Sequence, residues 1–447
     1  MDITRQLAQR IVDTRPERIP EPARVVACQA LMDFIGVAIA GAREPLADIL
    51  AAEIDAEGSH PQAQLLGRSG RASVRQAALF NGSAGHAHDY DDVQAAMTGH
   101  PTVPVAPAAL ALAEHLERSG AEVIAAFCAG VDAECVLGRF AGTNHYTRGW
   151  HSTGTLGAFG AAAAAAQLRH LDVTQTATAL GIAGTQAAGL KAQFGTMCKP
   201  LHAGHAAATG VDAANLAARG FTSRLDILEA DQGFLATQSE CGSAAQWEKA
   251  LAVPAYTQDI CFKYHAACYL THSSIEAVKS LSERHGLAPK DVADMEICVD
   301  QGHLKVCNIA EPQTGLEAKF SLRLTAAMAM AGVNTASIDV FTDEAAQSEE
   351  LAALRDRVSV AAHADRNPNS IVNIRTADGR SYSEACNVAI PMTDLDAQWR
   401  KLETKFRALV APRLGDTAAS AIIEACHGLE QADSIKPLMA LVKGHAA

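Results

Sequence analysis

The segment Asn81–Pro101 concentrates side chains that can carry protons. Its imidazoles and carboxylates are those of His86, His88, His100, Asp89, Asp91 and Asp92. Histidine titrates near neutral pH, and a neighbouring carboxylate can orient its ring and tune its pKa. If the preceding helix continued through this segment, His86 would share a face with Asp89. His88 would then share a face with Asp92. The alternative is a helix end with solvated acids, but the density of these groups favours a pocket that moves protons.

The segment Tyr146–Thr153 (YTRGWHST) is expected to lead into a helix. Gly149 allows a tight turn, and Ser152 or Thr153 can cap the helix that follows. His151 would then lie at a helix N-terminus, where the dipole and the free N–H groups favour an anion and keep a histidine neutral. A neutral His151 is available as a base. The alternative is a capping segment with an incidental aromatic cluster.

Lys199-Pro200 ends a loop and opens an alanine-rich helix. A desolvated Lys199 can bind a carboxylate or donate a proton. The alternative, which applies to any single lysine, is a surface side chain whose stem covers apolar atoms.

The segment KYHAACYLTH runs from Lys263 to His272. Helical spacing would place His265, Cys268 and His272 on one side. We expect no metal there, because the segment has neither an HExxH pattern nor closely spaced Cys and His ligands. A nucleophilic Cys268 has equally weak support, since only nearby His and Lys residues would stabilise a thiolate.

Apolar spacing and Gly/Pro punctuation predict one helix after another up to about residue 260. Gly154, Gly157 and Gly160 lie near one face of their helix, which indicates close helix packing rather than a phosphate loop, since no strand and no GxGxxG pattern precede them. The predicted helices are Pro22–Ala42, Val74–His86, Pro104–Glu117, Ala121–Arg139, Thr153–His170, Val173–Ala188 and His202–Arg219.

Strand patterns begin beyond Asp259 and predict a mixed α/β module. The predicted elements there are the strands Met295–Val299 and Val358–Ala362, a hairpin Ser370–Cys386 that turns at Asp378-Gly379, and the helices Ser273–His285 and Phe320–Ala331. Helical patterning returns after Pro391, in Leu395–Val410, Thr417–His427 and Ser434–Lys443. These last helices could pack on the first helical part, which would make the α/β module an insertion.

The length, composition and net charge of the chain limit the class of protein to which it can belong. A chain of 447 residues can form two or three domains, and its low aromatic content of 5% beside abundant alanine suits closely packed helices. A net charge of -13 argues against a nucleic-acid surface. The 11 cysteines show no CxxC pair, and we find no signal peptide or membrane span, so we expect a cytoplasmic protein.

Several segments together resemble the MmgE/PrpD family, which includes 2-methylcitrate dehydratase, cis-aconitate decarboxylase and iminodisuccinate epimerase. The resemblance covers most of the chain. It rests on FNGSAGHAHDYDD with the following HP, GWHSTGTLGAFGAAAAAA, KPLHAGHAAATGVDAANLAARGFT, KYHAACYLTH and EAKFSL. These motifs are specific in combination, although none would suffice alone.

The resemblance implies a mainly α fold: a large all-helical domain built from both chain ends (1–262 and 395–447) and an inserted α/β lid domain (263–394). It implies a homodimer, a pocket between the domains, and no metal or organic cofactor. Carried over residue by residue, the family's site positions fall on Asp89, His100, His151, Lys199 and Lys263. We add Tyr146 as a further acid, and we expect His202, Cys268 and Gln193 to bind substrate together with Lys263.

Three departures from the decarboxylase pattern bear on the reaction. Cys268 stands where decarboxylase-type members carry a histidine, and Ala266 stands in place of their proline. The spacing from Asp89 to His100 is one residue longer, and Val93 occupies a threonine position. We therefore expect an epimerase that abstracts a proton alpha to a carboxylate of an iminodisuccinate-like dicarboxylate. The alternatives are a 2-methylcitrate-type dehydratase and a non-catalytic helical dimer that binds a carboxylate.

Overall fold

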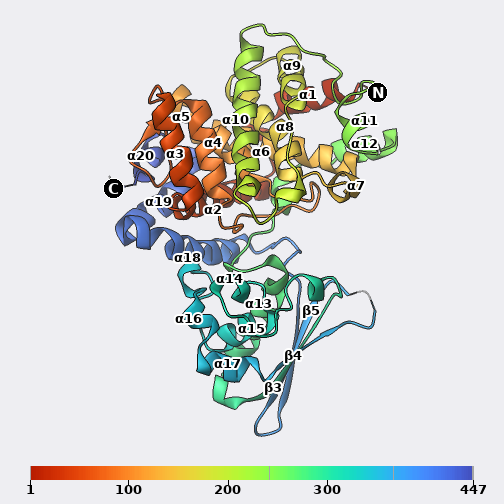
Figure 1. Cartoon of the computed structure of the whole chain (residues 1–447). Coiled ribbons are helices and arrows are strands. Elements are labelled where there is room, and N and C mark those ends of the chain that lie inside the picture. The colour runs from red at the N-terminus through yellow and green to blue at the C-terminus, as the bar shows by residue number, and fades with distance from the viewer. Residues whose placement is uncertain (1, 241, 366, 445–447) are drawn as a thin grey trace. The chain divides into compact units, whose positions relative to one another are not determined.

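The computed structural model describes residues 2–240, 242–365 and 367–444. The chain is mainly helical with a small mixed sheet, as the sequence predicts at this coarse level. It divides into two compact units, Met1–Phe262 with Thr393–Ala447, and Lys263–Met392 (Figure 1). The sequence-based expectation for the second unit is 263–394.

The first unit is built from helices around α8 (Ser152–Leu168), which packs against α5, α6, α9 and α10. Its other helices are α1 (Ile3–Asp13), α2 (Glu21–Gly41), α3 (Pro45–Glu57), α4 (Val74–Gly85), α5 (Thr102–Leu116), α6 (Gly120–Ala141), α7 (Thr143–Thr147), α9 (Val173–Gly184), α10 (Cys198–Ala218), α11 (Phe234–Gln238), α12 (Ala244–Leu251), α18 (Leu395–Leu414), α19 (Asp416–His427) and α20 (Lys436–Leu441). The expectation of an all-helical part is wrong in one detail, because β1 (Ala63–Gln64) and β2 (Arg71–Ala72) form a short antiparallel pair.

Small residues let these helices approach closely. A Cβ atom added at Gly154 would lie 2.5 Å from the carbonyl oxygen of Ala188, and one at Gly157 would lie 2.6 Å from Pro104. On α10, a Cβ atom at Gly210 would lie 2.4 Å from Ala161 of α8. The close packing predicted for the glycines of α8 is therefore confirmed, and it brings the ends of α4, α5, α8 and α10 together.

The C-terminal helices belong to the first unit. Helix α18 packs against α2, and α19 packs against both; in Figure 1 these blue helices lie beside the red α2. Helix α2 is long and apolar enough to cross a membrane, with a mean hydropathy of 1.6, but 89% of its apolar window is buried in the structure. Burial of this kind is what the core helix of a globular domain requires.

The second unit holds a four-stranded mixed sheet with the order β4-β3-β5-β6. Strand β3 (Val292–Val299) is parallel to β4 (Val358–Ala362) and antiparallel to β5 (Ser370–Thr376). Strand β5 forms the predicted hairpin with β6 (Ser381–Cys386), and Gly379 adopts φ 89° in its turn. The unit's helices are α13 (Tyr269–His285), α14 (Gly315–Ala318), α15 (Leu322–Met330), α16 (Asp343–Ala346) and α17 (Glu349–Arg355).

An apolar core holds this second unit together. The inward residues of β3 and β5, among them Met295, Ile297 and Val372, pack with Ile275 of α13 and Leu322 of α15. The prediction that His265, Cys268 and His272 share a helix face is wrong, because α13 begins only at Tyr269 with Cys268 as its N-cap.

Candidate active site

The segment after α4 does not continue as a helix. Helix α4 ends at Gly85, and Asp89 adopts a left-handed backbone with φ 51°, a conformation that aspartate tolerates better than most residues. The expected pairs His86–Asp89 and His88–Asp92 are therefore wrong. The turn instead directs the side chain of Asp91 toward His86 and returns the chain toward α5.

Asp91 lies between two histidines. Its Oδ1 atom is 2.9 Å from Nδ1 of His86, and its Oδ2 atom is 3.0 Å from Nδ1 of His100. Nδ1 of His100 also lies 2.9 Å from the backbone carbonyl oxygen of Asp92. Burial opposes ionisation, but His100 and His86 together hold the pKa of the Asp91 carboxyl well below its usual range. Asp91 is therefore a buried carboxylate that accepts a hydrogen bond from His86 and lies at ion-pair distance from His100.

Lys199 supplies a positive charge beside this group. Its Nζ atom, near the start of α10, lies 2.9 Å from Oδ1 of Asp89. The same carboxylate oxygen lies 3.5 Å from Nε2 of His100. The Lys199 side chain is 15% exposed and that of Asp89 is 54% exposed, so the pair borders solvent. Lys199 is thus not an isolated surface lysine.

His151 lies at the N-terminus of α8, as the sequence predicts, but it is itself the N-cap residue. The expectation that Ser152 or Thr153 caps the helix is wrong: Ser152 is the first helical residue, and Thr153 Oγ1 accepts a hydrogen bond from the backbone N–H of His100 at 3.1 Å. Nδ1 of His151 lies 3.0 Å from Nδ1 of His202 on α10. One of these two nitrogens must donate and the other accept, so the two rings share one proton.

The buried histidines are held neutral. Burial lowers the pKa of His86 to about 4, with a smaller opposing effect from Asp91. Burial lowers the pKa of His151 to about 2, and His86, His100, Lys199 and His202 add to the effect. The proton affinity of each ring is reduced, because a charged imidazolium is costly in a desolvated site that already holds positive groups.

The site therefore forms where four helices end. His86 is the C-cap of α4, His100 precedes α5, His151 caps α8, and Lys199 lies in the first turn of α10. Three of these ends are N-terminal and carry partial positive charge. Together with Lys199 they make a surrounding that favours a small anion.

Two further residues that the sequence analysis selected in the first unit, Tyr146 and Gln193, have different surroundings. Tyr146 is half-buried, and burial together with Asp89 raises the pKa of its hydroxyl. Nζ of Lys191 lies 3.7 Å from the centre of the Tyr146 ring. Gln193 is exposed in a short turn, where its side-chain oxygen accepts a hydrogen bond from Thr196 at 3.1 Å. The structure groups Gln193 with its own turn rather than with the histidines.

Lys263 and Cys268 lie in the second unit. Lys263 is buried, and its charge helps burial and His265 to keep the pKa of His272 well below the usual value. Nε2 of His265 lies 2.9 Å from Glu276. The backbone N–H of Cys268 donates to the carbonyl of Lys319 at 2.9 Å. Lys263 therefore lies near buried polar side chains of its own unit.

Sequence reasoning missed three contributors. Asp91 and His86 belong to the opening segment, but neither was among the expected site residues. The third is Lys405 of α18, a buried residue whose Nζ atom donates to the carbonyl of Tyr90 at 2.8 Å and lies 2.7 Å from Asp33. Nothing in the spacing of Lys405 connects it to a loop 315 residues away.

Ligand atoms of His86, Asp89, Asp91 and His100 all lie within 4.8 Å of one another, an arrangement that can hold a metal ion. The ammonium group of Lys199 already lies against Asp89, where a metal would add a second positive charge. Asp91 also uses its oxygens on the two imidazole Nδ1 atoms. This donor set therefore fits a proton-transfer site better than a metal centre.

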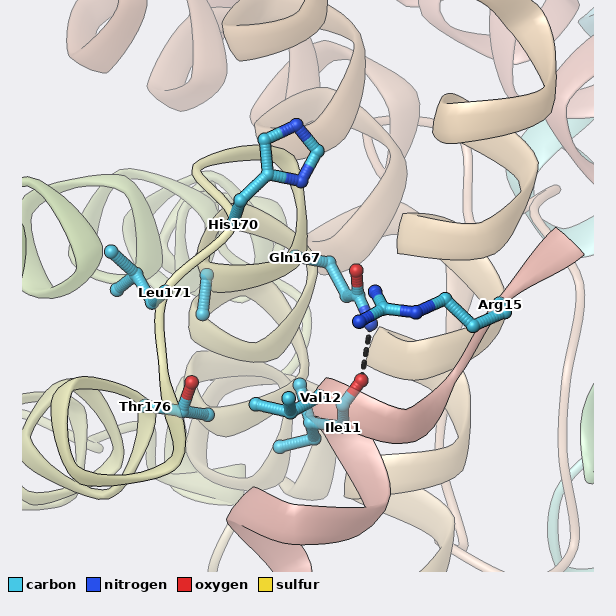
Figure 2. Close-up of a pocket in the computed structure, with 8 residues that line it drawn as sticks. Ile11, Val12, Arg15, Gln167, His170, Leu171 and Thr176 are labelled. Atoms are coloured by element: carbon cyan, nitrogen blue, oxygen red, sulfur yellow. Dashed lines mark hydrogen bonds between the residues drawn. The ribbon is translucent and has the colours of Figure 1, made fainter.

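A separate cavity of about 370 Å³ lies elsewhere in the first unit, between α1 and the end of α8. Figure 2 shows Arg15, Gln167 and His170 around it, with Gln167 hydrogen-bonded to the backbone of Ile11. The histidines of the candidate site do not line this cavity, so it has no part in the chemistry described above.

Comparisons with known proteins agree with the resemblance read from the motifs. Residues 5–245 match the MmgE/PrpD N-terminal domain, and residues 265–431 match the MmgE/PrpD C-terminal domain. Human cis-aconitate decarboxylase is 29% identical over 395 residues, which are 82% of this chain and 79% of that protein. The mouse enzyme is 26% identical over 82% of this chain and 78% of its own length. Cis-aconitate decarboxylase from Aspergillus terreus is 28% identical over 63% of this chain and 61% of its own length.

These relatives are decarboxylases, and they give no support to the expected iminodisuccinate epimerisation. The two domain matches, with the site motifs inside them, establish the identity at family level: the chain belongs to the MmgE/PrpD family.

Proposed function

We propose that this protein is a lyase that acts on a small tricarboxylic acid of the cis-aconitate class by moving a proton between a histidine and carbon. One observation carries the proposal: neutral, buried histidines and the ammonium group of Lys199 meet where three helix N-termini converge. This surrounding attracts carboxylates and offers nitrogen atoms that can take or give a proton.

Substrate binding would change the protonation of the site. The pKa of His86 and that of His151 are low because burial and neighbouring positive groups disfavour their charged forms. A polyanionic substrate brings negative charge next to these rings and raises both pKa values. Substrate binding would therefore be accompanied by proton uptake, and a histidine would hold that proton next to the reacting carbon.

The relatives favour decarboxylation as the first candidate reaction. The bond between carbon and one carboxylate breaks, CO₂ leaves, and the electron pair moves into the neighbouring double bond and carboxylate. A histidine then donates its proton to carbon and recovers it from water. Lys199 would stabilise the negative charge that develops on the remaining carboxylate.

A hydro-lyase reaction is the second candidate, and Cys268 with Ala266 favours it, because both depart from the decarboxylase pattern. In that reaction a histidine removes a proton next to a carboxylate, and an acid protonates the leaving hydroxyl group. Tyr146, whose raised pKa keeps its hydroxyl protonated, is the acid we assign to this step.

The test is turnover of cis-aconitate, citrate and 2-methylcitrate by the purified chain. Release of CO₂ from cis-aconitate supports decarboxylation, whereas gain or loss of alkene absorbance without CO₂ supports the hydro-lyase. The His151→Ala variant should abolish either activity. Unchanged concentrations of all three acids, or turnover that survives His151→Ala, would contradict the proposal.

A further inference from the structure

The surroundings of two ring nitrogens determine where their protons are. Nδ1 of His86 faces Oδ1 of Asp91 at 2.9 Å. Nδ1 of His100 faces two oxygens, the Asp92 carbonyl at 2.9 Å and Asp91 Oδ2 at 3.0 Å. A carbonyl oxygen cannot donate a hydrogen bond, and neither can an ionised carboxylate. Each Nδ1 must therefore carry the proton and donate it.

This requirement leaves the other nitrogen of each neutral ring with a lone pair. Nε2 of His86 is buried, and it makes no hydrogen bond within the part of the chain that the structure describes. Nε2 of His100 lies near Asp89, 3.5 Å from Oδ1. A buried nitrogen acceptor without a donor is costly, so its persistence at a candidate site points to a use in chemistry.

His86 lies close to two other histidines of the candidate site, His100 and His151. Its ring centre is 4.7 Å from that of His100 and 5.8 Å from that of His151, and it is stacked on the latter. A proton taken up at His86 would thus be near both rings. This position, behind a carboxylate that orients it, is the arrangement in which a histidine is held ready as a base.

We propose that Asp91 is a positioning residue that fixes both His86 and His100 as Nδ1–H tautomers, and that His86 is a further proton-carrying histidine of the site. The kinetic part of this proposal rests on the proposed lyase function. The tautomer part does not, because it concerns the resting protein alone.

The loop around Asp91 is held firmly enough for such a role. Lys405 donates to the carbonyl of Tyr90, the residue before Asp91, and pairs with Asp33 behind it. On the other side, the Asp92 carboxyl accepts a hydrogen bond from Thr102 Oγ1 at 2.5 Å. The side chain of Asp92 is thus used in the fold, while that of Asp91 is directed at the histidines.

The first experiment is nitrogen NMR of the wild-type protein labelled with [¹⁵N]histidine, with His86→Asn and His100→Asn used to assign the two rings. We expect each ring, in its neutral form, to show a protonated Nδ1 and an unprotonated Nε2. Finding either neutral ring as the Nε2–H tautomer would overturn the proposal. This measurement needs neither turnover nor an Asp91 variant that folds.

The second experiment replaces Asp91 in the full chain. Asp91→Asn should lower kcat by about 10²–10⁴-fold with little change in KM, as expected when a carboxylate that orients a catalytic histidine is lost. Its amide group would also shift one ring to the Nε2–H tautomer. Asp91→Glu should restore part of the lost kcat, because it keeps the charge.

Asp92→Asn is the matched control, since it makes the same change at the adjacent buried carboxyl. Burial already raises the pKa of the Asp92 carboxyl well above its usual value, so the neutral amide resembles the resting side chain. We expect its kcat to change by less than about tenfold, which corresponds to less than about 1.4 kcal/mol.

Full kcat in a folded Asp91→Asn protein would refute the positioning role. If no acid were turned over by the wild-type chain, the proposed function would fail while the NMR result still tested the tautomers.

Discussion

Lys199 and Asp89 form an ion pair in which the ammonium nitrogen lies 2.9 Å from the carboxylate oxygen. A substrate carboxylate that binds Lys199 must compete with Asp89 or bind beside it. The pair therefore keeps the positive charge of Lys199 in place at the edge of the histidine cluster before substrate arrives.

Removal of this charge should cost transition-state stabilisation. We expect Lys199→Met to lower kcat/KM by about 10²–10³-fold, the usual loss when a donor to a developing anion is removed. Lys199→Arg should lose less, because the charge remains although its geometry changes. The measurement is steady-state kinetics with the acid that the wild type turns over.

Lys436→Met is a suitable control for that experiment. Lys436 also belongs to an ion pair of the first unit, with Glu117, but both side chains are exposed. Its replacement should leave kcat/KM unchanged. An equal loss in both variants would show that the effect of Lys199 is not specific to the site.

Substrate binding should be accompanied by proton uptake. The low pKa values of His86 and His151, about 4 and about 2, leave both rings neutral in the free protein. A bound polycarboxylate raises them. Calorimetric titration with tricarballylate, a saturated tricarboxylate, in two buffers of different ionisation enthalpy measures the protons taken up. We expect net uptake near neutral pH; net release would contradict the electrostatic account of the site.

His86 should make the stability of the first unit depend on pH. Its pKa is lowered from 6.5 to about 4 in the folded protein, so the unfolded state binds the proton more readily. The stabilising effect is fully present above about pH 6.5 and is lost as the pH falls through about 4. At about 1.4 kcal/mol per pKa unit, the change amounts to roughly 3 kcal/mol.

Chemical unfolding of wild type and His86→Asn across this pH range tests the point. The wild type should lose stability more steeply on acidification than the variant. His427→Asn, a change at a histidine on the surface of α19, serves as the comparison. Parallel pH curves for wild type and His86→Asn would rule out the predicted linkage.

The buried pair of Lys405 and Asp33 should matter for stability as well as for the loop. Lys405→Met leaves the Asp33 carboxyl buried without its ammonium partner, which typically costs about 3–5 kcal/mol. Adding Asp33→Asn should recover part of that loss, because the uncompensated charge is removed. Denaturant unfolding of the two single variants and the double variant gives the coupling energy directly. Strictly additive losses would show that the two residues are not coupled.

The helical framework could be predicted from the sequence because its signals are local. Apolar spacing located α4, α8 and α10, and the glycines of α8 correctly indicated close packing. The hairpin of β5 and β6 followed from Asp378-Gly379. Helices α1 and α3 were not predicted, although Pro45 marks the start of α3.

The partners within the site could not be predicted, because they depend on how the loop turns after α4. Helical spacing paired His86 with Asp89, but the left-handed backbone at Asp89 ends that register and presents Asp91 to His86 instead. The N-cap of α8 lies one residue earlier than expected, at His151. Lys405 contacts the loop from α18, and no local sequence pattern predicts a contact between residues so far apart in the chain.

The most direct test of the central claim is turnover of cis-aconitate in heavy water, followed by proton NMR. The proposed decarboxylation predicts release of CO₂ and a product that carries one deuterium on the carbon protonated by the enzyme, and both should disappear in His151→Ala. Recovery of unchanged substrate, or deuterium exchange into cis-aconitate with neither release of CO₂ nor addition of water, would contradict the assignment of a lyase.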